Sequence, residues 1–296
     1  MEYKIIADSC CDTTGEIREK LKLELVPLKI MLSSDIEYID TLDLDITDMI
    51  DNMKLSSSVK TTCPSIEDYC SFMYKYDNLF VVTLASFLSG SYNAAVAARD
   101  LVLEEFPNKQ IHVFDSLNAC SGELNLVLYI NELIKRGYSF KETVNLTQEY
   151  IVGLTTLFVL EDLGNMIKNG RMSKITERVA SILNIYPVLG NHECNEIKMI
   201  SKVRGLNNAH ERMIELLSKW TENLPDKSIS VTMSHCEVAA RAEAIKENIL
   251  FSCKAVNNVI MVPTGGLSAV YANRGGIIIS FQILPQEVTD ILLNEF

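Results

Sequence analysis

A short run of hydroxyl side chains around one glycine is the stretch of this chain best suited to chemistry. Residues 78–83, NLFVVT, are typical of a buried strand, and residues 92–103 have the alanine content and apolar spacing of a helix. Between them lie Ser89, Gly90 and Ser91. The first amides of a helix have no partner within the helix and carry partial positive charge, so such a turn suits an anion. Serine more often caps a helix, and this stretch alone favours capping over ligand binding.

Polar residues also follow two other expected strands. Asp8 and Ser9 follow an apolar run at the start of the chain, and Asp115 and Ser116 follow the run at residues 110–114. In a parallel α/β sheet, ligands collect at the carboxyl ends of the strands. We therefore expect these polar turns to converge at one edge of a sheet.

A second hydroxyl-rich segment lies upstream, at residues 60–65, KTTCPS. Pro64 interrupts regular structure, and Ser65 is a suitable cap for a helix expected over residues 66–76. We expect residues 60–65 to form a turn that presents Thr61 and Thr62.

Strands that alternate with helices predict an α/β protein with a mostly parallel sheet flanked by helices in its first half. We place a domain boundary near Gly153, giving an N-terminal lobe over residues 1–153 and a second α/β lobe over residues 154–296. In the second lobe we expect helices over residues 175–183, 206–220 and 238–249, strands over 154–160, 186–189, 196–201, 228–234, 255–262 and 276–281, and turns at 169–173, 202–205 and 264–268.

Composition excludes several classes of protein. The 296 residues carry a net charge of −12, and lysine and arginine form no run that could follow a nucleic acid backbone. No apolar stretch approaches the ~20 residues of a membrane span. The first residues enter a strand pattern directly, without the pattern of a secretory leader, so we expect a cytoplasmic protein.

The eight cysteines form no C-x-x-C pair, so a metal site is not expected. We expect most of them to be reduced, small, buried residues. The adjacent Cys10 and Cys11 could be redox-active, but a structural role is favoured.

An ordered set of motifs resembles the DegV family over essentially the whole chain. The motifs are Asp8-Ser9 with Asp12, residues 60–65 (KTTCPS), 88–92 (LSGSY), 114–116 (FDS), 169–171 (NGR) and 202–205 (KVRG), and the late glycine turn. The resemblance implies a two-lobed α/β protein that binds one long-chain fatty acid such as palmitate, with the carboxyl group held between the lobes and the acyl chain buried. It implies no cofactor and no catalytic residue. Some members present the fatty acid to a separate kinase that makes acyl-phosphate.

Carried over to this chain, the resemblance implies a set of ligand-binding residues. Hydroxyls and free helix amides bind a carboxylate or a carboxylic acid without a metal, which agrees with the serine-rich turn. Arginines near the pocket mouth would suit a phosphate or an acidic partner, although a surface salt bridge is the alternative role for each. The set is Thr61, Thr62, Ser89, Gly90 and Ser91 for the carboxyl group, Arg171 and Arg204 at the mouth, and Thr264 and Gly265 in the glycine turn.

The chain departs from the family pattern at Met261, which stands where we align the family's histidine. Methionine cannot donate a hydrogen bond to a carboxylate or share a proton during phosphoryl transfer. We expect lipid binding to survive this change and coupling to a kinase to be weakened. Cys63 also replaces a polar residue common in its loop.

Two further hypotheses compete with a fatty-acid carrier. A hydrolase or phosphatase could use Asp8, Asp12 and Asp115 at the strand ends, although the chain has neither a G-x-S-x-G motif nor a G-K-[ST] phosphate loop. The plainer role for Asp8 and Asp115 is to bond neighbouring loop amides. A pure interaction protein would carry no small molecule. The sequence leaves acyl-chain length and oligomeric state open.

Overall fold

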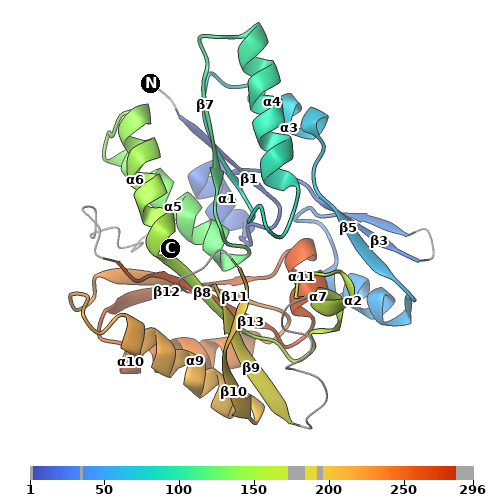
Figure 1. Ribbon diagram of the computed structural model, residues 1–296, viewed down its shortest axis with the longest axis vertical. Helices are drawn as coiled ribbons and strands as arrows, with labels where there is room; N and C mark the ends of the chain where they lie inside the picture. Colours follow the sequence, from blue (N-terminus) through green and yellow to red (C-terminus); the bar gives the residue numbers. More distant parts are fainter. Residues whose placement is uncertain (1–2, 34–35, 173–183, 192–195, 285–296) are drawn as a thin grey trace. The chain divides into compact units, whose positions relative to one another are not determined.

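The computed structural model describes residues 3–33, 36–172, 184–191 and 196–284 (Figure 1). Contacts divide the chain into two compact units. Unit 1 holds the residues up to Val152 together with Gly265–Ser268, and unit 2 holds Gly153–Thr264 and the residues from Ala269 onward. Each unit has its own sheet and helices, so the predicted α/β fold with a second sheet region is confirmed.

Unit 1 is built on a four-stranded parallel sheet in the order β2-β1-β6-β7. Strand β6 supplies the apolar run expected from the sequence, and Leu79 through Thr83 are all buried, as is typical of a strand covered on both faces. The strands are β1 (Lys4–Asp8), β2 (Glu24–Val26), β6 (Asn78–Thr83) and β7 (Gln110–Asp115), and the helices of this part are α1 (Gly15–Leu21), α3 (Ile66–Met73), α4 (Ser91–Glu105), α5 (Ser121–Lys135) and α6 (Phe140–Gly153).

Helices α3 and α4 lie side by side in Figure 1 and share one apolar core with the sheet. Tyr69 and Met73 of α3, together with Ala95 and Ala98 of α4, are fully buried in this core. The two small alanines let α4 approach closely. This packing fixes the position of the α4 N-terminus beyond the end of β6.

A small antiparallel sheet and one helix complete unit 1. Its strands are β3 (Lys29–Leu32), β4 (Glu37–Ile39) and β5 (Val59–Thr62), in the order β4-β3-β5, and the helix is α2 (Ile46–Leu55). The prediction of a turn at residues 60–65 is therefore wrong for Thr61 and Thr62, which pair with Ile30 and Lys29 on β3. Three of the four β5 residues are β-branched, which favours the extended backbone.

Unit 2 is built on a six-stranded sheet in the order β10-β9-β8-β13-β11-β12, in which only β11 and β12 run parallel. Helices α9 and α10 lie beside each other in Figure 1 and share a large apolar core with the sheet. The elements are β8 (Leu154–Val159), α7 (Gly164–Lys168), β9 (Ile185–Gly190), β10 (Lys198–Arg204), α9 (Leu206–Trp220), β11 (Ile229–His235), α10 (Ala239–Ser252), β12 (Val256–Pro263), α11 (Gly266–Ala272) and β13 (Ile277–Gln282).

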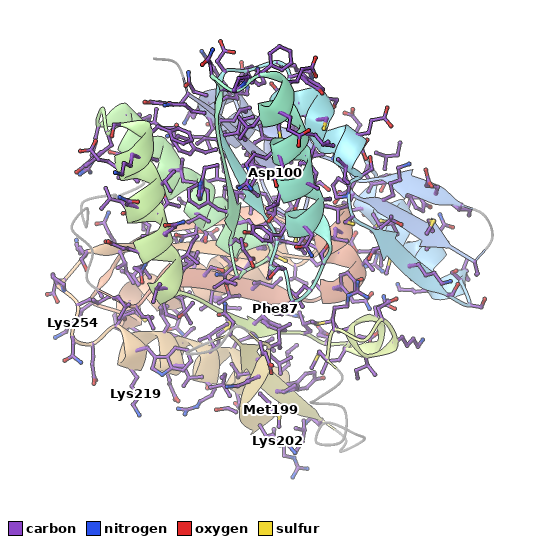
Figure 2. The ribbon with its side chains drawn as sticks, turned by 45° about the horizontal axis from the view of Figure 1, so that its top comes forward. Phe87, Asp100, Met199, Lys202, Lys219 and Lys254 are labelled. Atoms are coloured by element: carbon purple, nitrogen blue, oxygen red, sulfur yellow. The ribbon has the colours of Figure 1, made fainter. Side chains whose placement is uncertain are left out.

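The predicted turn at residues 202–205 is also wrong for its first three residues. Lys202 and Met199 lie on β10 (Figure 2), and residues 198–204 pair with β9. The chain turns at Gly205, whose φ of 88° suits glycine, and α9 begins directly afterwards. The helix predicted over residues 175–183 lies outside the described residues.

The cysteines of the described residues are free thiols. Cys10, Cys11, Cys236 and Cys253 are buried, as predicted, whereas Cys63, Cys70 and Cys120 are partly exposed. Cys194 lies outside the described residues. None of the helices described is long and apolar enough to cross a membrane.

Candidate functional site

The N-terminus of α4 carries the serine-rich turn. Gly90 is the N-cap residue, and no side chain caps the helix. The Ser91 amide donates to Ser89 Oγ at 3.3 Å, and the two serine hydroxyl oxygens are 3.2 Å apart. The capping role that the sequence favoured is adopted in part, because the Ser89 hydroxyl accepts the first amide of the helix. The N-cap residue itself offers no side chain, so a fifteen-residue helix begins beside two hydroxyl groups, which is an arrangement that suits an anion.

The segment after β5 lies against this turn. A Cβ added to Gly90 would stand 3.2 Å from the Cys63 sulfur, so the two backbones are close. Thr61 is half-buried, and Thr62, directly before Cys63, is exposed. The structure thus brings the KTTC and LSGS segments together within unit 1, although they are separated by two elements of the chain.

Buried polar side chains lie behind the turn. Ser91, Asp8 and Tyr69 are fully buried, and the Ser91 hydroxyl lies near enough to the Asp8 carboxylate to lower its pKa. Asp8 Oδ2 also accepts from the Leu84 amide at 2.9 Å, and Asp8 Oδ1 accepts from the Cys10 amide at 3.1 Å. Burial raises the pKa of Asp8 to about 7, and these hydrogen bonds oppose the rise.

Glu123, which sequence analysis did not select, belongs to the same cluster. It lies in the first turn of α5 and is fully buried. Burial and the Asp8 charge raise its pKa well above the usual value. The available signal in the sequence was the single carboxylate of the largely apolar run GELNLVLYI at the start of this helix.

The same cluster contains the donor atoms that could surround a cation. One ligand atom each from Asp8, Cys10 and Glu123 lie within 4.8 Å of one another. Both Asp8 oxygens already accept backbone amides, and burial together with the neighbouring Cys120 thiol raises the Cys10 pKa well above its usual value, which keeps that thiol protonated. This chemistry does not fit a metal site, and we assign none.

The late glycine turn is held by carboxylates of unit 1. The Gly265 amide donates to Asp12 Oδ1 at 2.8 Å, and the Gly266 and Leu267 amides donate to the two Asp40 oxygens at 2.6 and 2.9 Å. A Cβ on Gly266 would stand 2.7 Å from Asp40 Oδ1, so the close approach requires glycine. The predicted domain boundary assigned residues 265–268 to the second lobe, whereas these bonds join them to unit 1.

The three aspartates considered for a hydrolase all bind backbone amides. Asp115 Oδ1 accepts from the Ser86 amide at 3.0 Å and from the Leu117 amide at 3.2 Å, beside the loop that carries the exposed Phe87 (Figure 2). Asp8 and Asp12 accept amides as described above. The plainer, loop-holding role predicted for Asp8 and Asp115 is confirmed.

The two arginines of the predicted set belong to unit 2. Arg171 Nη1 donates to the Asn169 carbonyl at 2.5 Å, and its guanidinium lies 5.9 Å from the centre of the Tyr271 ring. Arg204 is exposed at the end of β10. Its backbone carbonyl accepts from the Asn208 side chain at 2.8 Å.

Thr264 is also in unit 2, buried between the ends of two parallel strands. Its amide donates to the His235 carbonyl at 3.0 Å, and His235 pairs with Pro263. Met261, at the expected histidine position, is partly buried and packs against the unit 2 core. His235 is nearly fully buried, and burial lowers its pKa, so the ring is neutral near pH 7.

These features define an α/β protein with a hydroxyl-lined helix N-terminus above a buried acidic cluster. The family model described as an uncharacterised protein of the DegV family matches residues 2–283. A DegV domain-containing protein of Streptococcus pyogenes serotype M1 is 35% identical, with 96% of this chain and 100% of that protein aligned. The chain belongs to the DegV family.

Solved structures agree with this assignment. A DegV family protein of Ruminococcus gnavus, refined with vaccenic acid, is 36% identical with a TM-score of 0.88, covering 94% of this chain and 99% of its own. The Streptococcus pneumoniae Fatty Acid Kinase (Fak) B3 protein, loaded with linoleic acid, is 32% identical with a TM-score of 0.85, covering 96% and 100%. A DegV family protein of Eubacterium eligens, loaded with heptadecanoic acid, is 27% identical with a TM-score of 0.85, covering 96% and 100%. The comparisons lend no support to the hydrolase hypothesis.

Proposed function

We propose that this protein is a non-enzymatic carrier that binds one long-chain fatty acid, with its carboxyl group at the Ser89–Ser91 turn. The observation that carries the proposal is the α4 N-terminus, which begins without a side-chain cap beside two serine hydroxyls. The related proteins with bound vaccenic, linoleic and heptadecanoic acids support a fatty acid as the anion. Thr61 and Thr62 approach the turn through Cys63 and are proposed as further hydroxyl donors.

The proposed roles of the other predicted residues follow from their positions. The exposed Arg204 and the half-buried Arg171 remain candidates for contact with a phosphate or an acidic partner. Thr264 contributes a hydroxyl at the start of the glycine turn. The Gly265 amide is engaged by Asp12, so its proposed contribution is the shape of the turn rather than a donor.

Lipid extraction tests the carrier proposal. The purified protein is denatured and extracted with organic solvent, and the released fatty acid is quantified by mass spectrometry against protein. We expect near-stoichiometric fatty acid in the wild type and a loss or faster exchange in Ser89→Ala/Ser91→Ala. Ser86→Ala is the matched control, because Ser86 is an exposed serine of the same loop. Absence of lipid from repeated wild-type preparations would overturn the proposal.

A fatty acid kinase is the proposed partner, on the basis of the relative named as a Fatty Acid Kinase B3 protein. Loaded protein is incubated with a fatty acid kinase and ATP, and acyl-phosphate is measured. We expect slow turnover that Met261→His increases, since histidine supplies the proton donor that methionine lacks. Met261→Leu is the matched control. Equal turnover by the wild type, Met261→His and Met261→Leu would show that Met261 does not limit acyl-phosphate formation.

A further inference from the structure

Glu123 is a buried carboxyl group whose two oxygens lack a well-formed hydrogen bond. Its side chain is fully buried at the start of α5, and neither oxygen has a hydrogen-bond partner of acceptable geometry among the described residues. One of its oxygens nevertheless lies within 4.8 Å of an Asp8 oxygen. A buried carboxylate left in this state is costly, and in practice such a group takes up a proton instead.

Geometry decides which member of the pair holds the proton. Asp8 accepts two backbone amides, which stabilise its anion, and the neighbouring Ser91 hydroxyl also lowers the Asp8 pKa. Among the described residues, Glu123 has no backbone donor and only the Cys10 thiol lowers its pKa, whereas burial and then the Asp8 charge raise it. A protonated Glu123 becomes a donor and completes its own hydrogen bonding through Asp8.

The other titratable groups that face the pair are acids. They are the thiols of Cys10 and Cys11 after β1, the thiol of Cys120 before α5 and the phenol of Tyr69 on α3. The pKa values of Cys10, Cys11 and Tyr69 are raised well above their usual values, chiefly by burial for Cys11 and Tyr69 and by the Cys120 thiol together with burial for Cys10. None of the strongest influences on the pKa of Glu123 is a cation. This environment therefore accommodates no more than one negative charge on Asp8 and Glu123 together.

The pair acts on the candidate site through Ser91. A serine hydroxyl has one proton to donate. When that proton is donated to the Asp8 anion, Ser91 offers only lone pairs to a ligand, which suits a protonated carboxylic acid. When Asp8 takes up a proton from water, Asp8 can donate to Ser91, and the Ser91 proton becomes available to a carboxylate.

We propose that Glu123 retains a proton that it shares with Asp8, and that the charge of Asp8 sets through Ser91 whether the α4 turn receives a carboxylate or a carboxylic acid. The inference rests on the proposed function for the identity of the ligand, but the proton on Glu123 does not. Glu123 is accordingly a positioning residue, and no bond to the ligand is assigned to it.

Infrared spectroscopy of the lipid-free protein tests the proton directly. A protonated carboxyl group gives its own carbonyl band, separate from those of carboxylates. At about pH 8.5, above the Asp8 pKa of about 7, we expect this band to move when glutamate side chains carry a ¹³C carboxyl label and to stay when aspartate is labelled instead. Glu123→Gln should remove the band, and Glu132→Gln, on the same helix and ion-paired with Arg136, should retain it. Absence of the band, or a shift upon aspartate labelling, would overturn the proposal.

Titration of a bound head group tests the link to Ser91. The protein is loaded with palmitic acid labelled with ¹³C at its carboxyl carbon, and the chemical shift of that carbon is followed against pH. We expect a transition near the Asp8 pKa of about 7 in the wild type and none there in Asp8→Asn. Glu123→Leu removes one hydrogen bond to the anion and should raise the midpoint by about one pH unit, whereas Glu123→Gln restores a donor and should leave it nearly unchanged.

The two arms separate the possible failures. A merely structural role for Glu123 would lower stability without moving the midpoint, and an unmoved midpoint in Glu123→Leu would overturn the link. Protein that shows the infrared band but binds no palmitic acid would overturn the proposed function and leave the proton pair standing. Protein that binds palmitic acid without the band would overturn the pair alone.

Discussion

The two units bury polar groups in different ways. In unit 1 the buried carboxylates of Asp8, Asp12 and Asp40 lie at or beyond strand ends and accept hydrogen bonds from loop amides. In unit 2 the buried hydroxyls lie along the strands, and Thr156 Oγ1 and Ser280 Oγ pair with each other at 2.6 Å. Carboxylates at loops hold backbone shape and change with pH, whereas paired hydroxyls within a sheet do neither. Unit 1 is therefore the part suited to a site, and unit 2 is dominated by its apolar core.

The largest expected effect is in that core. Phe281 is fully buried among the residues of the unit 2 core, and Phe281→Ala should lower the free energy of unfolding by about 4 kcal/mol. Urea unfolding followed by the fluorescence of Trp220, the single tryptophan, reports on this unit. Phe251→Ala is the matched control, since Phe251 is 93% exposed and its loss should cost less than about 0.5 kcal/mol. Similar costs for the two changes would contradict the assignment of the core.

Loss of a buried carboxylate in unit 1 should lower the free energy of unfolding nearly as much. Asp40→Ala leaves the Gly266 and Leu267 amides and the Ser9 hydroxyl without their acceptor, so we expect a loss of about 3 kcal/mol. Circular dichroism during urea unfolding measures it. Asp43→Ala, at an exposed aspartate nearby, should change the free energy of unfolding by less than about 0.5 kcal/mol. A small effect of Asp40→Ala would mean that water replaces the carboxylate.

The units should respond to pH in opposite directions. The pKa of Asp8 is raised by burial to about 7, so its stabilising contribution is complete below its unfolded-state pKa and is lost as pH rises through about 7, at up to about 1.4 kcal/mol per pH unit for one proton. The pKa of His210 in unit 2 is lowered by burial to about 4, so its contribution is present above its unfolded-state pKa and is lost as pH falls.

Hydrogen exchange, corrected for the intrinsic effect of pH on amides, resolves the two responses. Peptides of β1 and α5 should lose protection as pH rises from about 4 through about 7, and peptides of α9 should lose it below about pH 6. Glu123→Gln should reduce the loss in unit 1 at high pH, because it removes one of the two buried acids, while leaving α9 unchanged. Loss of protection in both units at high pH would contradict the opposite responses expected of them.

The smallest expected effect is steric. Gly90→Ala places a methyl group 3.2 Å from the Cys63 sulfur, so one of the two segments must shift by a few tenths of an ångström. The backbone of Gly90, with φ of −76°, accepts alanine, and stability should change by less than about 1 kcal/mol. Fatty acid exchange should become faster, and Cys63→Ala in the same protein should restore it. Failure of the second change to restore exchange would show that the two segments are not coupled.

Sequence periodicity was a reliable guide to long elements. The helix over residues 206–220 agrees with α9 at both ends, because its apolar spacing is uninterrupted and Gly205 precedes it. The strand at 78–83 agrees with β6. Short polar segments were less predictable. Residues 60–62 and 202–204 were predicted as turns, and both are strands, because pairing with a distant partner outweighed their local polarity.

The candidate site was only partly predictable for a similar reason. Ser89, Gly90 and Ser91 could be found because helix, turn and strand are adjacent in sequence. Glu123 could not be found in this way, because its importance arises from Asp8, which is more than a hundred residues earlier in the chain. Gly265 was found as a glycine turn, but its attachment to Asp12 was not, since no local pattern encodes such a distant hydrogen bond.

The sequence by itself determined the class of fold, the main helices and strands, the serine-rich turn and the family, because each depends on local spacing or on an ordered set of motifs. The tertiary structure decided which amides are engaged and which carboxyl groups are sealed from water. It placed residues 265–268 in unit 1 and Glu123 beside Asp8. The physical reason is that hydrogen-bond partners and burial depend on neighbours in space, and these set the charge behind the α4 turn.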